Sequence, residues 1–235
     1  MPISYVGAGT AVQTVTTTLT IAGHASSQVG DIHIAHIISI NNTAITAPDA
    51  TWFEISQANF TGSRGAIFWK RLTATGAGSY DFGVAGTTTS YGIVTAHRGC
   101  KKHGKPYGAV TTSNNASADS VTYATIVPHS NSGVLVAVAL YAEDATTPET
   151  VDGAVHVFAA PTVDTEQATN EDATIAISFA PITTAAASGA LGQVMASVTD
   201  AVNQGILFDL MSEETEAGSN VGGVLYPRRV RIGDR

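Results

Sequence analysis

Three residues with metal-binding side chains follow one another at even spacing: His97, Cys100 and His103. Imidazole nitrogens and a thiolate are ligands that zinc prefers, and three of them could hold the ion. However, a fourth ligand and a second His/Cys pair are missing, and the segment is a lysine-rich loop bounded by glycines. The sequence therefore favours a basic, solvated loop here and predicts no metal site.

His33 and His36 lie in one apolar run and look like a functional pair. Residues three apart on a strand point to opposite faces of the sheet, so the two rings cannot act together. We expect both to be half-buried sheet residues.

The remaining candidates for chemistry are weak. The acidic turns 143–152 and 164–172 could offer oxygens to calcium, but neither has the Asp/Asn alternation, central Gly and terminal Glu of a calcium loop. Gly7-Ala8-Gly9 lacks the third glycine of a dinucleotide loop and is followed by strand-like residues. Neither Gly-x-Ser-x-Gly nor His-Glu-x-x-His nor a Walker sequence occurs. The sequence predicts neither catalysis nor a cofactor.

Six aromatic residues could line a platform for a sugar: Trp52, Trp69, Tyr80, Tyr91, Tyr107 and Tyr141. Such rings stack on pyranose faces as readily as they fill a core. On strands they are more often core residues, and we expect packing here.

The elements that hold these residues read as strands. Between residues 29 and 99, short runs rich in β-branched and aromatic residues are cut by Gly, Pro, Asn and Thr roughly every ten residues, as in an all-β sandwich or barrel. Ile32–Ile40 is an apolar run, and Tyr80–Val84 alternates strictly.

The same layout recurs about a hundred residues later. Gly30 and its apolar run match Gly133 and Val134–Tyr141, and Pro48 matches Pro148. The other matching segments are 66–72 with 173–179, 92–98 with 205–210, and 17–21 with 120–124. We predict an all-β fold, an antiparallel β-sandwich of jelly-roll-like form built from two pseudo-repeated halves.

Burial decides whether the halves form one domain. A half of roughly 100 residues has one apolar face, and the nearest equivalent face that could cover it belongs to the other half. The expected organisation is an N-terminal arm at 1–16, one sandwich at 17–216 with halves at about 17–105 and 119–212, a crossing loop at 99–118, and a basic C-terminal tail at 217–235. Residues 185–211 would also suit a helix, but the repeat favours strands there.

Composition excludes several classes of protein. Apolar residues make up 44% of the chain and can fill a core, whereas charged residues make up 13% and Thr, Ser, Ala and Gly are in surplus. Such a surface suits solvation or packing against neighbours more than catalysis. No apolar run is long enough to span a membrane, the first residues do not resemble a secretion signal, and the single Cys100 cannot form an internal disulfide.

The charges are unevenly placed. The net charge is −8, and no Lys or Arg occurs between Pro106 and Pro227. Eight of the eleven basic residues form two clusters: Arg98, Lys101, Lys102 and Lys105, and Arg228, Arg229, Arg231 and Arg235. An acidic body with basic ends is suited to docking on its own kind or on another acidic surface, so we take both clusters as candidate partner-binding residues. The alternative is that the tail is a solvated end.

A set of spaced motifs resembles a module of tailed-bacteriophage virion proteins. The motifs are Val29-Gly30-Asp31, Pro48 with Trp52, Phe68-Trp69-Lys70-Arg71, Tyr80-Asp81-Phe82 and Ala96-His97-Arg98-Gly99. The resemblance covers most of residues 17–210 and implies a β-sandwich of head-decoration, head-fibre or tail-fibre proteins. It carries no catalytic residues. This chain departs from the pattern at His97, where an aromatic is usual, and in its added residues 217–235.

From these observations we expect a capsid decoration, or cement, protein on the outside of a virion, made in the bacterial host cytoplasm. Its partners would be the major capsid protein and copies of itself, and the resemblance suggests trimers. No nucleic acid or membrane is expected as a partner. The alternative is a host-attachment module of a head or tail fibre that binds surface carbohydrate.

Overall fold

The computed structural model describes residues 2–86, 89–115, 120–142, 147–148, 151–152, 155–159, 163–165, 173–189, 191–196 and 202–213. The first half contains β1 (Ser4–Ala8), β2 (Val12–Thr14), β3 (Thr18–Ala22), β4 (Ile32–Ser39), β5 (Ile45–Thr46), β6 (Phe53–Phe60), β7 (Ser63–Arg71), β8 (Ser79–Val84) and β9 (Ser90–Arg98). The second half contains β10 (Tyr107–Asn115), β11 (Ser120–Tyr123), β12 (Val134–Tyr141), β13 (Thr147–Pro148), β14 (Val163–Thr165), β15 (Thr174–Pro181), β16 (Leu191–Ala196) and β17 (Asn203–Leu210).

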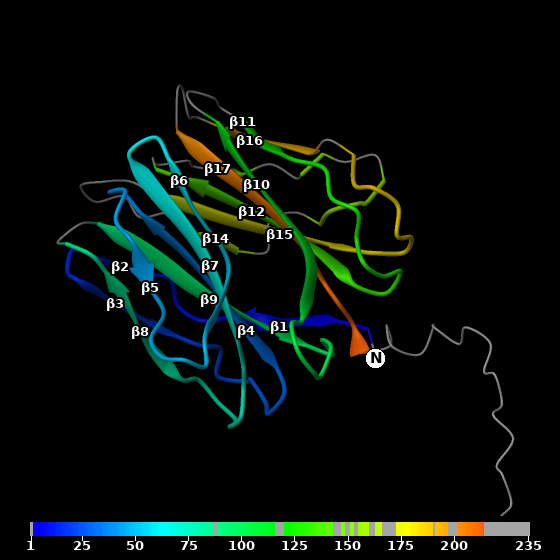
Figure 1. Cartoon of the computed structure of the whole chain (residues 1–235), viewed down its shortest axis with the longest axis horizontal. Coiled ribbons are helices and arrows are strands. Elements are labelled where there is room, and N and C mark those ends of the chain that lie inside the picture. Colours follow the sequence, from blue (N-terminus) through cyan, green and yellow to red (C-terminus); the bar gives the residue numbers. More distant parts are fainter. Residues whose placement is uncertain are drawn as a thin grey trace, which may run out of the picture.

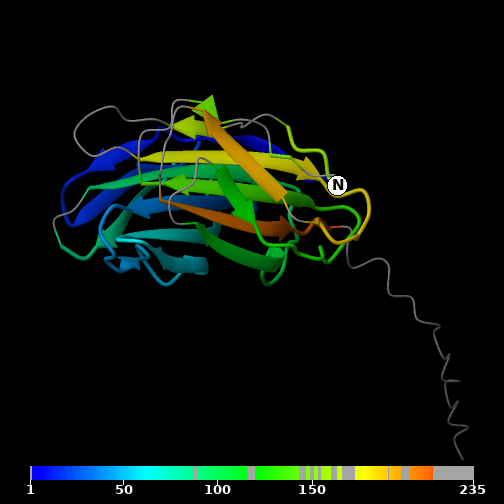
Figure 2. The same ribbon diagram turned by 90° about the horizontal axis from the view of Figure 1, so that it is seen from above.

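These strands form two large and two small antiparallel sheets. The large sheets have the orders β1-β9-β4-β7-β6, with β2 also paired to β9, and β10-β17-β12-β15-β14. The small sheets are β3-β8-β5 and β11-β16-β13. In Figure 1 most of the first half, blue through cyan to blue-green, lies at the lower left, and the second half, green to orange, lies at the upper right. Figure 2 shows that most strands of both halves run along the long axis of the body.

The two halves have matching topology. The places of β1, β9, β4, β7 and β6 in the first large sheet are taken by β10, β17, β12, β15 and β14 in the second. The small sheets correspond in the same way, β3-β8-β5 to β11-β16-β13. The predicted all-β sandwich with two pseudo-repeated halves is therefore confirmed, while its jelly-roll-like form stays a prediction.

The predicted crossing loop at 99–118 is wrong, because residues 107–115 form β10. This strand pairs with β17 over most of its length and is the counterpart of β1. The predicted N-terminal arm likewise supplies β1 and β2, both hydrogen-bonded to β9. Each repeat therefore begins before the point where the sequence comparison placed it, by two strands (β1 and β2) in the first half and by one (β10) in the second. A shared signal was present, since Tyr5 and Tyr107 each lie at the beginning of a strand and are followed within three residues by Gly-Ala.

Three apolar cores separate the four layers. The central core lies between the large sheets and includes Ile34 and Ile38 from β4 and Val136 and Val138 from β12. The two outer cores lie between each large sheet and its own small sheet. The expectation of one apolar face per half is thus wrong, because each large sheet is covered on both faces.

The sequence pattern explains this layering. Every residue of β4 and of β17 is buried, as expected for strands covered on both faces. By contrast, β3 alternates strictly between exposed and buried residues, and β8 does so over most of its length, as expected for outer strands with one wet face. Residues 191–196 and 203–210, which could also have been helical, are strands β16 and β17, as the repeat predicted.

Candidate functional site

The structure describes half of the proposed partner-binding set: Arg98, Lys101, Lys102 and Lys105. Arg98 donates from Nε to Asp31 Oδ1 at 2.9 Å and from Nη2 to Asp31 Oδ2 at 2.7 Å. Burial of Asp31 opposes its ionisation, but the hydrogen bonds from Arg98 and the Gln28 amide outweigh this, so its pKa is lowered. The pair joins the start of β4 to the end of β9, which gives Arg98 a role inside the fold.

The lysines of this cluster lie on the loop between β9 and β10. Lys102 Nζ forms an ion pair with the Glu213 carboxylate, and Lys105 Nζ lies 5.5 Å from the centre of the Tyr107 ring. The Lys101 amide donates to the Met211 carbonyl. The second cluster, Arg228, Arg229, Arg231 and Arg235, lies outside the described residues, as do most residues of the two acidic turns.

His97, Cys100 and His103 do not converge on one point. The His97 ring lies in the interior, with its centre 5.8 Å from that of Tyr5 and 5.2 Å from that of Phe179. Burial raises the pKa of Cys100 to about 12, so it is a neutral thiol in the central core. His103 is exposed on the loop. Within the described ranges, no three His, Cys, Asp or Glu side chains gather as a metal site.

His33 and His36 point to opposite faces of β4, as predicted, but both are fully buried rather than half-buried. His33 Nδ1 lies 3.0 Å from the Tyr80 hydroxyl of the small sheet. His36 points the other way, into the central core, where its Nε2 lies 3.0 Å from Thr95 Oγ1. The expectation failed because the outer sheet covers a face that was taken to be half exposed.

His36, Thr95 and His97 form a buried polar row in the central core. His97 Nε2 lies 3.1 Å from the same Thr95 hydroxyl that contacts His36. Burial lowers the pKa of His36 and of His97 to about 3, and that of His33 to about 4. All three histidines are therefore neutral near pH 7. Their surroundings suit packing and hydrogen bonding within the core.

The six aromatic residues considered for a sugar platform are all buried, with exposures of 7% or less. Trp52, for example, packs edge-on against Tyr80 and Phe82 in the outer core, at 4.8 and 5.1 Å between ring centres. The expectation that these residues pack the interior is confirmed. They cannot form an exposed platform together.

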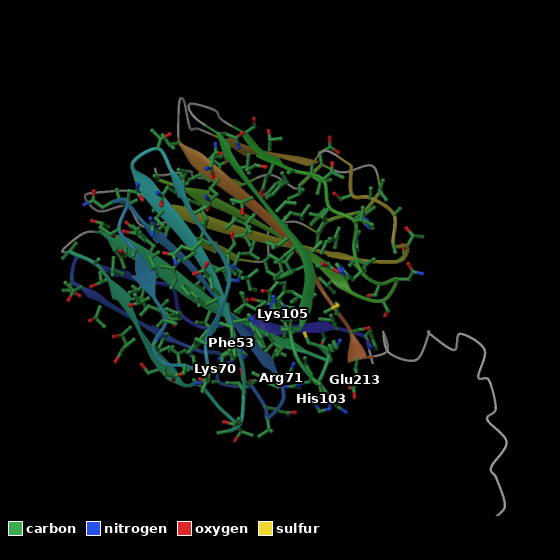
Figure 3. All side chains as sticks on the ribbon, viewed as in Figure 1. Phe53, Lys70, Arg71, His103, Lys105 and Glu213 are labelled. Carbon is green, nitrogen blue, oxygen red and sulfur yellow. The ribbon has the colours of Figure 1, made fainter. Side chains whose placement is uncertain are left out.

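An open groove of about 700 Å³ lies beside the start of β6. Its lining residues are Ala50, Thr51, Phe53, Glu54, Trp69, Arg71, Gly104, Lys105 and Tyr107. Phe53 is 52% exposed, and its ring lies 5.1 Å from that of Trp69 with 30° between the planes. Figure 3 shows Phe53, Arg71 and Lys105 close together where β6, β7 and the loop before β10 meet. The floor spans both halves, since the Tyr107 hydroxyl donates to the Glu54 carbonyl at 3.4 Å.

Sequence reasoning missed Phe53, although a signal existed. Adjacent residues of a strand point to opposite faces, so Trp52 and Phe53 could not share one core. Trp52 enters the outer core, which turns Phe53 to the other face of the sheet, the face of Trp69, on the edge strand β6. The partial cover that β10 gives this edge could not be foreseen while residues 107–115 were assigned to a loop.

Comparison of the chain with protein-family models, with curated proteins and with solved structures found no match. Among the described residues, no helix has the length and hydrophobicity that crossing a membrane requires.

Proposed function

We propose that this chain is a virion structural protein of a tailed bacteriophage that decorates and cements the outside of the capsid. It acts by burying surface and matching charge, and it catalyses no reaction. The observation that carries the proposal is the fused, four-layered body, in which two equivalent halves share a central core. In such a slab the outer strands and turns are what a partner meets.

The motifs that resemble phage virion modules support this proposal because they hold the fold together. Asp31 of the Gly-Asp motif binds Arg98 of the Arg-Gly ending. Trp52 packs against Tyr80 and Phe82 of the Tyr-x-Phe motif, and Lys70 Nζ lies 5.3 Å from the centre of the Tyr80 ring. The spaced residues therefore act as one structural unit rather than as scattered matches.

The outer strands present small polar side chains. Thr18 and Thr20 of β3 and Ser79 and Asp81 of β8 are exposed, and Thr20 Oγ1 donates to Asp81 Oδ1 at 2.7 Å. Short side chains lose little rotamer entropy when a neighbour covers them. This surface therefore suits side-by-side packing on a shell.

The test uses expanded, undecorated capsids of the phage whose genome carries this reading frame. The purified chain should bind them at about 10 µM or below and raise their melting temperature, and added salt should weaken binding because the docking uses charge. Replacing the four C-terminal arginines by glutamine should weaken binding, whereas Arg64→Gln on β7 should not. Absence of binding to the shells would refute the decoration function.

A further inference from the structure

The groove beside β6 carries two cations that have no carboxylate partner among the described residues. Arg71 donates from Nη1 to the Gly30 carbonyl at 3.4 Å and from Nη2 to the Lys101 carbonyl, which fixes its guanidinium in place. Lys105 lies over the Tyr107 ring. The carboxylate of the groove, Glu54, accepts a hydrogen bond from Gln57 at 3.0 Å. The groove is therefore locally positive in a chain of net charge −8.

The floor of the groove is aromatic. Trp69 is 7% exposed and supports the Phe53 ring, which presents about half of its surface to solvent. A flat apolar face that settles on this ring would remove apolar surface from water on both sides. The groove thus offers stacking and positive charge side by side.

The size of the groove distinguishes between classes of ligand. Its volume of about 700 Å³ falls within the range of small-molecule sites, which span roughly 300–1,000 Å³. A stable protein interface needs about 800 Å² on each partner, which is far more than this group of side chains supplies. A ligand of one or two rings fits better than a folded partner.

We infer that this groove binds a uronic acid residue of an acidic saccharide. The pyranose C–H face lies on Phe53, and the sugar carboxylate lies between Arg71 and Lys105. Glu54 and the Thr51 hydroxyl, which lines the same groove, accept hydrogen bonds from sugar hydroxyls. This site goes beyond capsid decoration, because it gives the protein a saccharide ligand in addition to the shell.

A nucleotide would also combine a flat ring with negative charge. Charge does not separate the two ligands, because the net positive groove attracts a phosphate dianion as well as a carboxylate. Groups that accept hydrogen bonds from hydroxyls, Glu54 and Thr51, line the groove beside the Phe53 ring and favour a sugar. We therefore assign the uronate and treat a nucleotide as an opposing outcome of the test.

The experiment titrates trigalacturonate into the full chain and follows binding by calorimetry and by tryptophan emission. Trp69 lines the groove whereas Trp52 is buried in the outer core, so an emission change reports on the groove. Maltotriose, a neutral saccharide of the same length, and AMP are the comparison ligands. We expect trigalacturonate to bind with a Kd below about 1 mM and maltotriose and AMP to bind at least about tenfold more weakly.

Two variants test the groove separately. Phe53→Ala removes the exposed ring and should weaken trigalacturonate binding by about tenfold. Lys105→Gln removes an exposed charge and should weaken binding by about threefold and reduce its salt dependence. Arg64→Gln is the matched control, because Arg64 lies at the opposite end of β7 from Arg71 and should leave binding unchanged.

Several outcomes would overturn the inference. These are no binding of trigalacturonate at about 10 mM, equal binding of maltotriose, preferred binding of AMP, or unchanged affinity in both groove variants. The titration needs no capsid. A failure here leaves the decoration function standing, and a failure to bind capsids leaves the saccharide site standing.

Discussion

At the residue scale, the buried histidines should make the fold sensitive to acid. The unfolded chain takes up protons near the ordinary histidine pKa of 6.5, whereas folded His36 and His97 resist protonation until about pH 3. The free energy of unfolding should be fully retained above pH 6.5. It should then fall by up to about 1.4 kcal/mol per pH unit for each buried histidine as the pH drops toward 3.

The second half suggests the variant that tests this prediction. In the first half Ile32 of β4 pairs with His97 of β9, and in the second half Val134 of β12 pairs with Leu210 of β17. Ile32 and Val134 are therefore equivalent positions. Four residues further along each strand, Val138 takes the place of His36. We expect His36→Val to reduce the loss of stability between pH 7 and pH 5, measured by urea denaturation, by about 1.4 kcal/mol per pH unit below 6.5. His103→Gln on the exposed loop is the control. An unchanged pH slope in His36→Val would contradict the assignment.

At the element scale, the two large sheets approach each other closely at Gly65 of β7. A Cβ at this position would overlap with the Gln204 side-chain oxygen and a Leu140 methyl group, both from the other half. Gln204 cannot easily yield, because it is fully buried and its amide nitrogen donates to Asn114 Oδ1 at 2.8 Å. Gly65→Ala should therefore lower the free energy of unfolding by about 1–3 kcal/mol through overpacking.

A glycine without such a neighbour provides the comparison. At Gly192 of β16, the nearest atom to an added Cβ is the Val121 carbonyl oxygen at 4.0 Å. Gly192→Ala should be neutral or slightly stabilising in the same urea denaturation, because alanine restricts the unfolded chain. Equal destabilisation by both substitutions would show that the loss of stability in Gly65→Ala does not come from overlap between the two large sheets.

The strands themselves were largely predictable, and the layers were not. The apolar runs at β4 and β12 and the alternation of β8 identified strands correctly. Burial of one or both faces of a strand sets the spacing of apolar residues along that strand, and this spacing can be read without knowing its neighbours. The same runs also implied burial on both faces, but the small sheets that provide it are built from short strands whose pairing partners a local pattern does not specify. Strand β10 was missed because Thr, Ser and Asn dominate it, and its apolar character comes from Tyr107 and Val110.

The candidate groove was less predictable still. Phe53 and Arg71 lie on the paired strands of one hairpin, but Lys105 joins them only because β10 follows its loop and crosses the edge of β6. A local pattern can show that Phe53 faces away from Trp52, but it cannot show which distant loop stands beside it. To predict a site between the two halves, the strand register of both halves must be known.

At the scale of the whole molecule, the shared core should make the two halves unfold together. Each half has an outer core of its own, yet Ile34 and Ile38 of the first half pack against Val136 and Val138 of the second. A half left alone would expose this whole sheet face to water, which is costly in proportion to the apolar area. We therefore expect one cooperative transition for the described body.

The positions of the tryptophans allow a direct measurement. Trp52 and Trp69 both lie in the first half, so their emission reports on that half, whereas far-UV circular dichroism reports on strands of both halves. The two signals should give the same urea midpoint within error if the halves unfold as one. Distinct midpoints would mean that the central core is a weak contact between two independent sandwiches. Gly65→Ala should shift both midpoints together, because in one cooperative unit a local loss of stability is shared by both halves.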